Sequence, residues 1–530
     1  MMQNISIRYI YMVAALIFSV SAQAQMKISF GGPATTKLNQ ALMAITNLYV
    51  DSVDDNSVVE DGIRGMIEKL DPHSAFVTAK EMKASAEALQ GNFDGIGVQF
   101  NIVEDTLLVI QPTTNGPSEK VGIMAGDRIV TVNDTSIAGV KMSKGDIMSR
   151  LRGPKGTQVR LGVVRRGISD MLHFTVVRDK IPVHSIDAYY MIRPTLGYVR
   201  ISGFGAQTHG ELMTAIEELK KQGMTDLIID LQSNSGGYLQ SATSIANEFL
   251  SDGDLVVYTE GRVMKRSDFK ANGRGSMTTG KICVLINEFS ASASEILSGA
   301  IQDNDRGVIV GRRSFGKGLV QRPITFEDGS ELRLTVAHYY TPSGRCIQKP
   351  YTKGDKTTYN EDILDRYKHG EMVSADSIHF ADSLRYYTLK KHRPVYGGGG
   401  IMPDYFVPMD TTRYTDCYRN IVAKGCLTDV NLKYIDRNRK QLKKDYPDFK
   451  TFQEKYTVSD ELLAEIYKEG EKKDVKPKDD EERAKTDDLL RLQMRALIAR
   501  NIWDMTEYFT IINETDPVVM KAVELMTKTK

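Results

Sequence analysis

The chain has 530 residues, more than one ordinary hydrophobic core holds, so we expect two to four domains. Its 69 lysines and arginines balance 68 aspartates and glutamates, and the formal net charge of +1 excludes a global electrostatic attraction to nucleic acid or to an anionic membrane. Four cysteines are too few for a scaffold built from disulfide bonds, although a bond between Cys417 and Cys426 across a short loop remains open.

The first residues have the pattern of a secretion signal. An apolar run from Ile10 to Phe18 follows Arg8 and precedes Ala22-Gln-Ala24, a small-residue cleavage pattern. We therefore interpret residues 1–24 as a signal peptide and expect an exported protein, periplasmic or in the cell envelope, that is soluble after signal cleavage. The alternative is an uncleaved membrane anchor, but the run is shorter than the about 20 apolar residues that a spanning helix needs.

Residues 25–90 form an N-terminal region that is expected to be helical. Between Thr36 and Leu70, apolar residues recur every three or four positions, which predicts two helices. Asp71-Pro-His-Ser74 ends the second helix because a proline disfavours helical geometry in the residue before it.

Residues 91–180 change to short β runs separated by glycines, a texture typical of a small barrel or sandwich. Five runs lie at 95–102, 106–111, 127–133, 159–164 and 172–177, with brief helices expected at 117–127 and 144–152. The segment resembles a PDZ domain, because it contains that family's carboxylate-binding loop, its AGDxI signature and a stretch common in bacterial members. These motifs are Gly95-Ile-Gly97, Ala125-Gly-Asp-Arg-Ile-Val130 and Leu151-Arg-Gly-Pro-Lys-Gly-Thr157. The resemblance implies that Gly95, Ile96 and Gly97 bind the free carboxylate of a peptide.

From residue 181 to about residue 410, strands alternate with helices. Strands are expected at 196–201, 226–231, 282–286 and 307–311. Leu212, Ile216 and Leu219 mark an amphipathic helix after the first strand, and a second helix follows Gly237. This alternation predicts an α/β layer with a largely parallel sheet. Residues 411–530 read as a charged, helical extension, to which we assign no chemistry.

Ser292 follows one of these strands, at the opening of the next expected helix. The first N–H groups of a helix have no partner within it, so the N–H of Ala293 is the natural first donor to an oxyanion. A second donor is expected from the turn Asn234-Ser-Gly-Gly237, where Gly236 and Gly237 permit close backbone approach. The alternative is that the serine merely caps the helix.

Lys317, in Ser314-Phe-Gly-Lys-Gly-Leu-Val-Gln321, is the candidate general base. A lysine has an unperturbed pKa of about 10.4, so it accepts a proton near neutrality only if burial lowers that pKa by several units. The flanking glycines let the backbone fold closely, and Gln321 is placed to hold the amine by a neutral hydrogen bond. A serine beside a neutral lysine suffices for acyl transfer without histidine or metal. The alternative is an exposed loop lysine, as most lysines are.

Two competing sites have less support. Ser314-Phe-Gly-Lys317 also fits the S-x-x-K pattern of penicillin-recognising enzymes, but we find neither an S-D-N nor a K-T-G companion. Of eight histidines none lies in a clear Ser-His-Asp arrangement, and His338 is expected to be a packed strand residue. No HExxH motif or Cys/His cluster indicates zinc. We therefore expect no cofactor and no bound metal.

Together these segments resemble the carboxyl-terminal processing peptidases, also called tail-specific proteases. The resemblance rests on the PDZ segment, on Asp230-Leu-Gln-Ser-Asn-Ser-Gly-Gly237 for the motif DLRxNxGG, and on Ser290–Glu295, Phe315–Gly318, Tyr340–Gln348 and Gly400–Asp404. It implies an α/β core similar to the ClpP/crotonase fold with an inserted PDZ domain. It also makes Ser292 the nucleophile, Lys317 the base and Gln321 the orienting partner of the lysine.

The chain departs from that family in two places. Gln232 replaces the usual arginine after Asp230-Leu, which puts the local salt bridge of that arginine in doubt. An insertion at residues 351–397 separates two motifs that normally lie closer together, and the tail after about Asp410 lies outside the resemblance.

The expected function is a serine endopeptidase acting through an acyl-enzyme. It would capture protein or peptide substrates with free C-termini in the PDZ groove by strand addition and cleave nearby. No nucleic acid is expected; a homo-oligomer, an adaptor and gating by the PDZ domain remain open. The alternatives are a non-catalytic PDZ scaffold on a protease-like core, which the intact Ser292, Lys317 and Gln321 disfavour, and a crotonase-like acyl-CoA enzyme, which the PDZ segment and the secretion signal disfavour.

Overall fold

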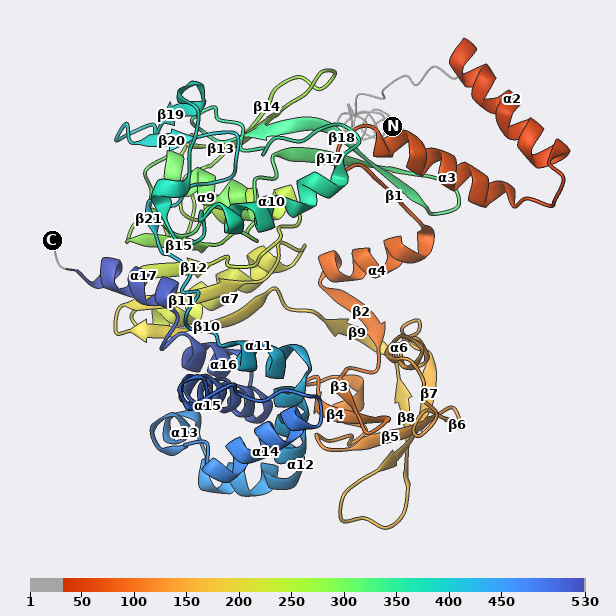
Figure 1. Ribbon diagram of the computed structural model, residues 1–530, viewed down its shortest axis with the longest axis vertical. Helices are drawn as coiled ribbons and strands as arrows, with labels where there is room; N and C mark the ends of the chain where they lie inside the picture. The colour runs from red at the N-terminus through yellow and green to blue at the C-terminus, as the bar shows by residue number, and fades with distance from the viewer. Residues whose placement is uncertain (1–31, 529–530) are drawn as a thin grey trace, which may run out of the picture. The chain divides into compact units, whose positions relative to one another are not determined.

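The computed structural model describes residues 32–528, and the expected signal peptide at residues 1–24 lies outside them (Figure 1). The chain divides at Met66 into two compact units. The first unit consists of the helix α2 (Pro33–Leu48), which starts with a proline in its first turn, and most of α3 (Asp55–Glu68). The two helices expected in this region are therefore confirmed.

The centre of the second unit is a six-stranded sheet that is parallel except for one edge strand. Three helices connect its strands: α7 (Thr208–Lys221), α8 (Leu239–Asn247) and α9 (Ala293–Asp303). The alternation predicted from sequence is confirmed, and each expected strand lies within one residue of its predicted ends. The strand order is β10 (Ile186–Arg193), β11 (Leu196–Ile201), β12 (Asp226–Asp230), β15 (Ile282–Ile286), β16 (Val308–Gly311) and β21 (Tyr405–Phe406), with β10 antiparallel to β11.

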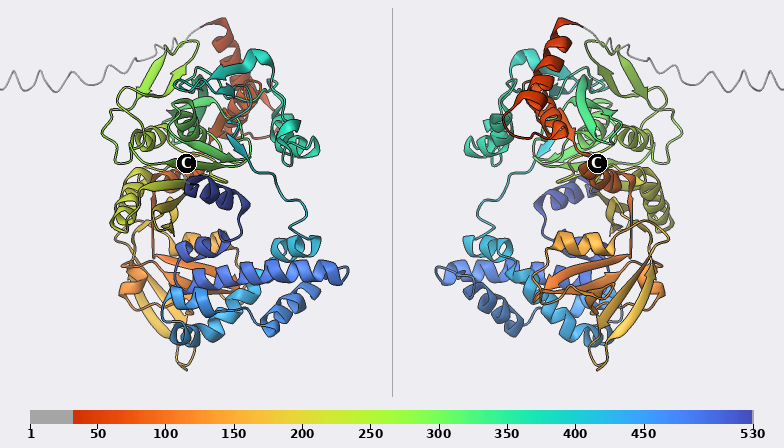
Figure 2. Two further views of the ribbon diagram at one scale, coloured as in Figure 1. Left: turned by 90° about the vertical axis from the view of Figure 1, so that its left-hand side faces the viewer. Right: turned by 90° about the vertical axis from the view of Figure 1, so that its right-hand side faces the viewer.

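A second, antiparallel sheet packs on the other side of α8 and α9 (Figures 1 and 2). Of its strands, only part of β18 (Glu331–Tyr340) was expected from the sequence. Tyr339 of this strand is buried in the same hydrophobic core as Ile296 and Leu297 of α9, so the helix that follows Ser292 lies between two sheets. The strands are β1 (Ala75–Val77), β18 (Glu331–Tyr340), β13 (Leu255–Glu260), β14 (Ser267–Lys270) and β17 (Leu319–Thr325).

The PDZ segment is a small antiparallel barrel-like sheet with two short helices, as predicted. The first predicted run is interrupted at Ile96-Gly97, so that β2 (Asn92–Gly95) pairs with β9 (Asp179–Pro182) outside the PDZ sheet. The remaining elements are β3 (Val98–Val103), β4 (Thr106–Pro112), β5 (Arg128–Val132), β6 (Thr135–Ser136), β7 (Gln158–Val164), β8 (Leu172–Val177), α5 (Pro117–Lys120) and α6 (Lys144–Leu151). The helix α4 (Ala79–Gln90) precedes β2.

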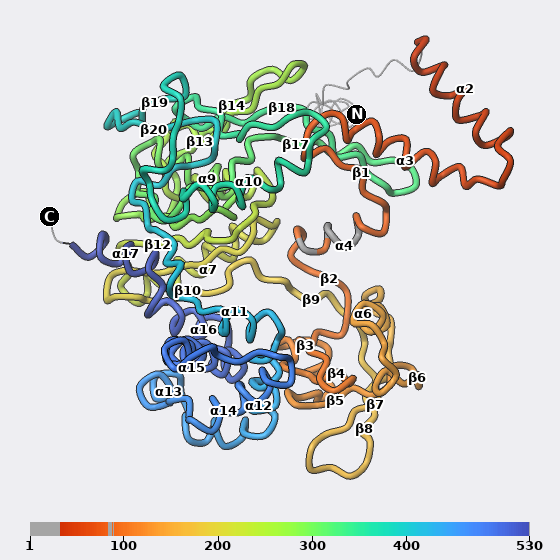
Figure 3. The backbone as a smooth tube through the Cα atoms, viewed as in Figure 1, coloured from red at the N-terminus to blue at the C-terminus, as the bar shows by residue number. Residues whose placement is uncertain are grey.

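The insertion after Lys349 is ordered and carries its own elements. They are α10 (Lys356–Lys368), the short turns η1 (Ala375–Ser377) and η2 (Asp382–Leu384), and the hairpin β19 (Arg385–Tyr387) with β20 (Pro394–Tyr396). After β21 the chain crosses to the helical extension (Figure 3).

The extension is helical, as predicted. Its helices are α11 (Asp416–Ala423), α12 (Cys426–Asp445), α13 (Phe449–Lys455), α14 (Asp460–Glu471), α15 (Asp480–Ile502), α16 (Met505–Ile512) and α17 (Pro517–Thr527). The last of these packs with Val518, Val519 and Val523 on the outer face of the parallel sheet. Cys417 and Cys426 are both free and buried. Within residues 32–528, no helix combines the length and the apolar character needed to cross a bilayer.

Candidate active site

Ser292 occupies a strained turn between β15 and α9. Its φ of 56° and ψ of −112° place a non-glycine residue in a sparsely populated region of backbone conformation. Its N–H donates to Glu295 Oε2 at 2.8 Å, which fixes the turn, and its side chain is half-buried. The surrounding structure therefore stabilises a conformation that projects the serine from the end of a buried helix.

The turn 234–237 lies directly against Ser292. A Cβ built on Gly236 would come within 2.8 Å of both Ala291 O and Ser292 Cβ and within 3.0 Å of Ala293 N, so only glycine permits this approach. Within the described chain, the N–H groups of Ala293 and Gly237 donate no hydrogen bond. The N–H of Gly236 is occupied, because it donates to Asn234 Oδ1 at 2.8 Å. Of the expected oxyanion donors, Ala293 and Gly237 are thus available and Gly236 is not.

The segment that carries Lys317 packs tightly against residues 348–349 and 399–400. Cβ atoms built on Gly316 and Gly318 would come within 3.1 Å of Gly400 N and within 2.8 Å of Gln348 N, as expected for glycines that allow close folding. Burial lowers the pKa of Lys317; the charge of Glu295 opposes this shift and that of Arg333 adds to it. Because burial is the largest of these influences, the net shift favours a neutral amine.

Glu295 joins the two segments, and the sequence analysis assigned it no role. Its fully buried carboxylate accepts from the N–H groups of Ser292 (2.8 Å), Lys317 (2.9 Å) and Gly316 (2.7 Å) and from Ser314 Oγ (2.6 Å). Burial raises the pKa of Glu295, while these four donors oppose the shift. The spacing Ser-x-x-Glu is that of a capping box, and this signal in the sequence could have identified the residue.

Tyr339 of β18 makes a second connection between the same two segments. Its hydroxyl lies 3.1 Å from Ser292 O and also donates to Lys317 O. The side chain is fully buried, and burial raises its pKa well above the usual value for tyrosine. Glu295 therefore holds the N–H groups of Ser292 and Lys317, and Tyr339 holds their carbonyls.

The predicted catalytic side chains are not joined by hydrogen bonds in the described chain. Within the described chain, no hydrogen bond joins Ser292 Oγ to Lys317 Nζ, and none joins Gln321 to Lys317. Gln321 Nε2 instead donates to Thr335 Oγ1 at 3.2 Å, and Thr335 Oγ1 donates to Asp71 Oδ1 at 2.9 Å. The structure thus links the backbones of Ser292 and Lys317 through Glu295 and Tyr339, without a hydrogen bond between Ser292 Oγ and Lys317 Nζ among the described residues.

The charge of Lys317 acts on His73, a residue with no role expected from the sequence. Its Nε2 is 2.8 Å from the hydroxyl of Tyr359, a residue of the insertion. Burial, followed by the charge of Lys317, lowers the pKa of His73 to about 4, so the imidazole is neutral near pH 7. No group of three or more histidine, cysteine or acidic side chains in residues 32–528 is arranged to hold a metal ion.

The competing serine, Ser314, is fully buried and fully occupied. Its hydroxyl donates to Glu295 Oε1 at 2.6 Å and accepts from Ile401 N at 2.6 Å. A hydroxyl in this position cannot reach a substrate carbonyl. Ser314 is therefore a structural link between the segments of Glu295 and Ile401.

The carboxylate of Asp230, two residues before Gln232, is bound by side chains of the neighbouring strand β11. Arg200 of β11 donates from Nη1 to Asp230 Oδ2 at 2.7 Å and from Nη2 to Gln232 O at 2.9 Å. Tyr198 also donates to Asp230 Oδ2, at 2.6 Å. Asp230 therefore keeps a guanidinium partner although the motif lacks its arginine.

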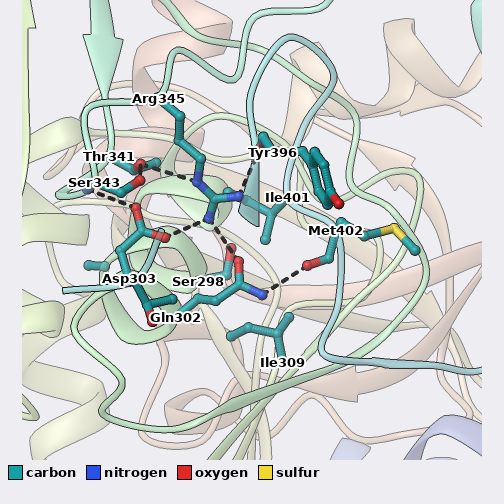
Figure 4. A network of polar contacts seen from close by, with 12 residues as sticks. Ser298, Gln302, Asp303, Ile309, Thr341, Ser343, Arg345, Tyr396, Ile401 and Met402 are labelled. Atoms are coloured by element: carbon teal, nitrogen blue, oxygen red, sulfur yellow. Dashed lines mark hydrogen bonds and ion pairs between the residues drawn. The ribbon is translucent and has the colours of Figure 1, made fainter. Parts of the chain in front are cut away.

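The far end of α9 is anchored by a buried ion pair (Figure 4). Arg345 and Asp303 have side chains that are 0% exposed, and Arg345 Nη2 lies 2.7 Å from Asp303 Oδ1. Arg345 also donates to Gln302 Oε1 at 2.8 Å and to Tyr396 O at 2.9 Å. The motif Tyr340–Gln348 thus fixes the C-terminal end of the helix whose N-terminal end carries Ser292.

In the PDZ segment, the loop Gly95-Ile-Gly97 is buried and has unused donors. Thr113 N donates to Gly97 O at 2.9 Å, and Ser118 Oγ donates to Ile96 O at 2.6 Å. Within the described chain, the N–H groups of Ile96 and Gly97 donate no hydrogen bond. Two adjacent unpaired N–H groups are what a peptide carboxylate requires.

Family models match four segments of the chain. Residues 195–358 match peptidase family S41, and residues 95–176 match the PDZ domain. Residues 15–81 match the N-terminal domain of the activating protease CtpB, and residues 417–504 match a family of unknown function.

Two curated relatives are similar over most of their length. A carboxy-terminal-processing protease of Bartonella bacilliformis is 35% identical over 370 residues, which are 68% of this chain and 81% of the relative. The carboxy-terminal processing protease CtpA of Bacillus subtilis is 31% identical over 378 residues, 69% of this chain and 79% of the relative. The solved structure of a photosystem II D1 C-terminal processing protease is 28% identical and covers 60% of this chain and 91% of its own, with a TM-score of 0.34.

Proposed function

Since the chain belongs to the carboxy-terminal processing proteases, serine-type peptidases of family S41, we propose that it cleaves protein tails with Ser292 as nucleophile and Lys317 as general base. The observation that carries this proposal is the Glu295 carboxylate, which accepts from the N–H groups of both Ser292 and Lys317. The lowered pKa of Lys317 adds support, because only a neutral amine accepts a proton.

In the proposed reaction, Lys317 takes the proton of Ser292 Oγ as that oxygen attacks the scissile carbonyl. The N–H groups of Ala293 and Gly237 donate to the oxyanion, and Gly236 allows the close approach that brings the second donor there. The lysine then gives its proton to the leaving amine, and water releases the acyl-enzyme. The two reactive atoms must first close to hydrogen-bonding distance, as often happens only when substrate is bound.

The PDZ segment would select the substrate by its free carboxylate. The N–H groups of Ile96 and Gly97 have the geometry of an anion-binding loop, and Gly95 ends the strand before them. A bound tail would add as an extended strand, so recognition would depend on the terminal carboxylate and on the side chains beside it. A peptide whose C-terminus is amidated should therefore bind weakly.

Export is part of the same proposal and rests on the sequence of residues 1–24. Cleavage after Ala24 would release a chain beginning at Gln25 into the periplasm or cell envelope. Sequencing the N-terminus of the protein recovered from cell fractions tests this, because an intact Met1 on membranes indicates an anchor instead.

The decisive experiment compares the protein with Ser292→Ala and Lys317→Ala variants. Each is incubated with an unstructured protein of known C-terminus, and intact mass is followed over time. We expect shortened products from the unaltered protein alone, with a rate that rises with pH through the lowered pKa of Lys317. Equal intact mass in all three samples supports a PDZ scaffold, and turnover of a CoA thioester supports a crotonase-like enzyme.

A further inference from the structure

Resting on the proposed function, in which Lys317 is the base, we propose that helix α10 of the insertion holds the Lys317 segment in its working position, with Arg366 as a positioning residue. The insertion at residues 351–397 was assigned no role from sequence. Its helix lies against the backbone of residues 314–318, and the contacts run to both sides of the lysine.

Arg366 binds the carbonyls of two consecutive peptide groups, those that precede Phe315 and Gly316. Its side chain is 3% exposed, and it donates from Nη1 to Ser314 O at 2.8 Å and from Nη2 to Phe315 O at 3.0 Å. A planar guanidinium with two parallel donors fixes the direction of both carbonyls, which a single point charge does not.

The guanidinium is itself held by the helix that carries it. Asp362 Oδ2 lies 2.9 Å from Arg366 Nε and 3.0 Å from Lys349 Nζ. Lys349 also donates to Tyr359 O at 2.9 Å, and its ammonium lies 4.1 Å from the centre of the Phe315 ring. The Asp362 carboxylate therefore links α10 to the loop at Lys349 and, through Arg366, to the segment before Lys317.

A second set of contacts reaches the residue that follows Lys317. Gly318 N donates to Gln348 Oε1 at 2.8 Å, and Gln348 Nε2 lies 3.3 Å from the Tyr359 hydroxyl. The same hydroxyl is 2.8 Å from His73 Nε2. The α10 helix thus contacts the backbone of the base segment directly before the lysine and, through Gln348, directly after it.

These contacts complement those of Glu295. The carboxylate of Glu295 accepts from the N–H groups of Gly316 and Lys317, whereas Arg366 donates to the carbonyls of Ser314 and Phe315. Buried backbone groups need such partners, so loss of the guanidinium would leave two carbonyls unsatisfied. Arg366 is too deeply buried to touch a substrate and acts only through the Lys317 segment.

The test uses the full-length protein with Arg366→Gln, Arg366→Lys and a control, Lys368→Gln. The control removes a positive charge from the same helix at an exposed residue whose ammonium pairs with Asp365. Initial rates on an unstructured protein with a free carboxyl end are measured from neutral to alkaline pH. Thermal unfolding of each variant is measured alongside.

For Arg366→Gln we expect a rate at neutral pH that is about 10- to 100-fold lower, because small displacements of catalytic groups have costs of this size. The pH midpoint of the rising limb should also move upward, since a loosened segment admits water to Lys317 and burial is what lowers its pKa. Arg366→Lys keeps the positive charge but loses the two parallel donors of the guanidinium, so its rate and pH midpoint should lie between those of Arg366→Gln and the unaltered protein. The charged and titratable groups that act on Lys317 stay unaltered in all variants: Glu295, Arg333, Asp71 and His73.

A rate and midpoint equal to those of Lys368→Gln would overturn the inference. A lower rate with an unmoved midpoint would also overturn it, because that result indicates lost stability alone. If Arg366→Gln does not fold, the rates and pH midpoints of Arg366→Lys and Tyr359→Phe are compared with those of Lys368→Gln instead. Lys317→Ala separates the two proposals: activity in that variant overturns the proposed function, whereas an inactive Lys317→Ala beside an unchanged Arg366→Gln overturns only the role of α10.

Discussion

The two ends of helix α9 each bury a carboxylate, and they neutralise it in different ways. At the C-terminal end, Asp303 pairs with Arg345, and both side chains are inaccessible to water. At the N-terminal end, Glu295 has no cationic partner within hydrogen-bonding distance among the described residues and is held by three N–H groups and one hydroxyl.

The helix dipole explains the difference. A carboxylate is favoured near the positive N-terminal end of a helix, where dipoles alone can stabilise it, and is disfavoured near the C-terminal end. Asp303 therefore needs the full charge of a guanidinium, whereas Glu295 does not. The comparison shows that an ion pair anchors one end of the helix, while at the other end the Glu295 carboxylate is stabilised by N–H groups and a hydroxyl of the segments that carry Ser292 and Lys317.

Breaking the anchoring end should have the largest effect on stability. Arg345→Met leaves the buried Asp303 without its cationic partner, and we expect the free energy of unfolding to fall by about 3–5 kcal/mol. Urea denaturation measures this loss. Arg385→Met, which removes an exposed arginine that pairs with Asp382 within the insertion, is the matched control and should be indistinguishable from the unaltered protein. A loss no greater than that of the control would contradict the role given to the ion pair.

Altering the reactive end should affect the reaction more than the fold. Glu295→Gln turns one acceptor oxygen into an NH₂ group that faces N–H donors, and we expect the rate to fall by about 100-fold, or about 2.7 kcal/mol, as the segments of Ser292 and Lys317 separate. Glu507→Gln makes the same change in the capping box of α16 and serves as control. Equal rates for the two variants would show that Glu295 only caps its helix.

The smallest expected effect concerns the strain at Ser292. Ser292→Gly and Ser292→Ala should both be inactive, but glycine accepts a φ of 56° without strain. We therefore expect Ser292→Gly to be more stable than Ser292→Ala by about 1 kcal/mol, although the gain is reduced by the greater flexibility of glycine in the unfolded chain. Parallel urea titrations provide the comparison, and an alanine variant of equal or higher stability would argue against stored strain.

The parallel sheet could be predicted because its strands are buried on both faces. The runs 227–229 and 282–286 are continuously apolar, and this pattern is visible in a single sequence. The strands β14 and β17 have polar, exposed residues and a proline, Pro323, so no period marked them as strands.

The site divides in the same way. Ser292, Lys317 and the glycines stand in local motifs, and their surroundings follow from those motifs. Tyr339 comes to the site from strand β18, and Arg366 comes from the insertion. Each binds a backbone carbonyl that is far away in the sequence, so no local motif predicts the contact. Gln321 was expected to meet Lys317, but a bulge after Val320 accompanies its pairing with Thr335.

The guanidinium that Arg200 supplies to Asp230 also determines what an arginine at position 232 would meet. Such an arginine would enter a hollow that Arg312 and Arg413 already line, next to a carboxylate that already has a cationic partner. Repulsion among the guanidinium groups would oppose that change. The uncharged side chain of Gln232 therefore suits a site that is already rich in arginine.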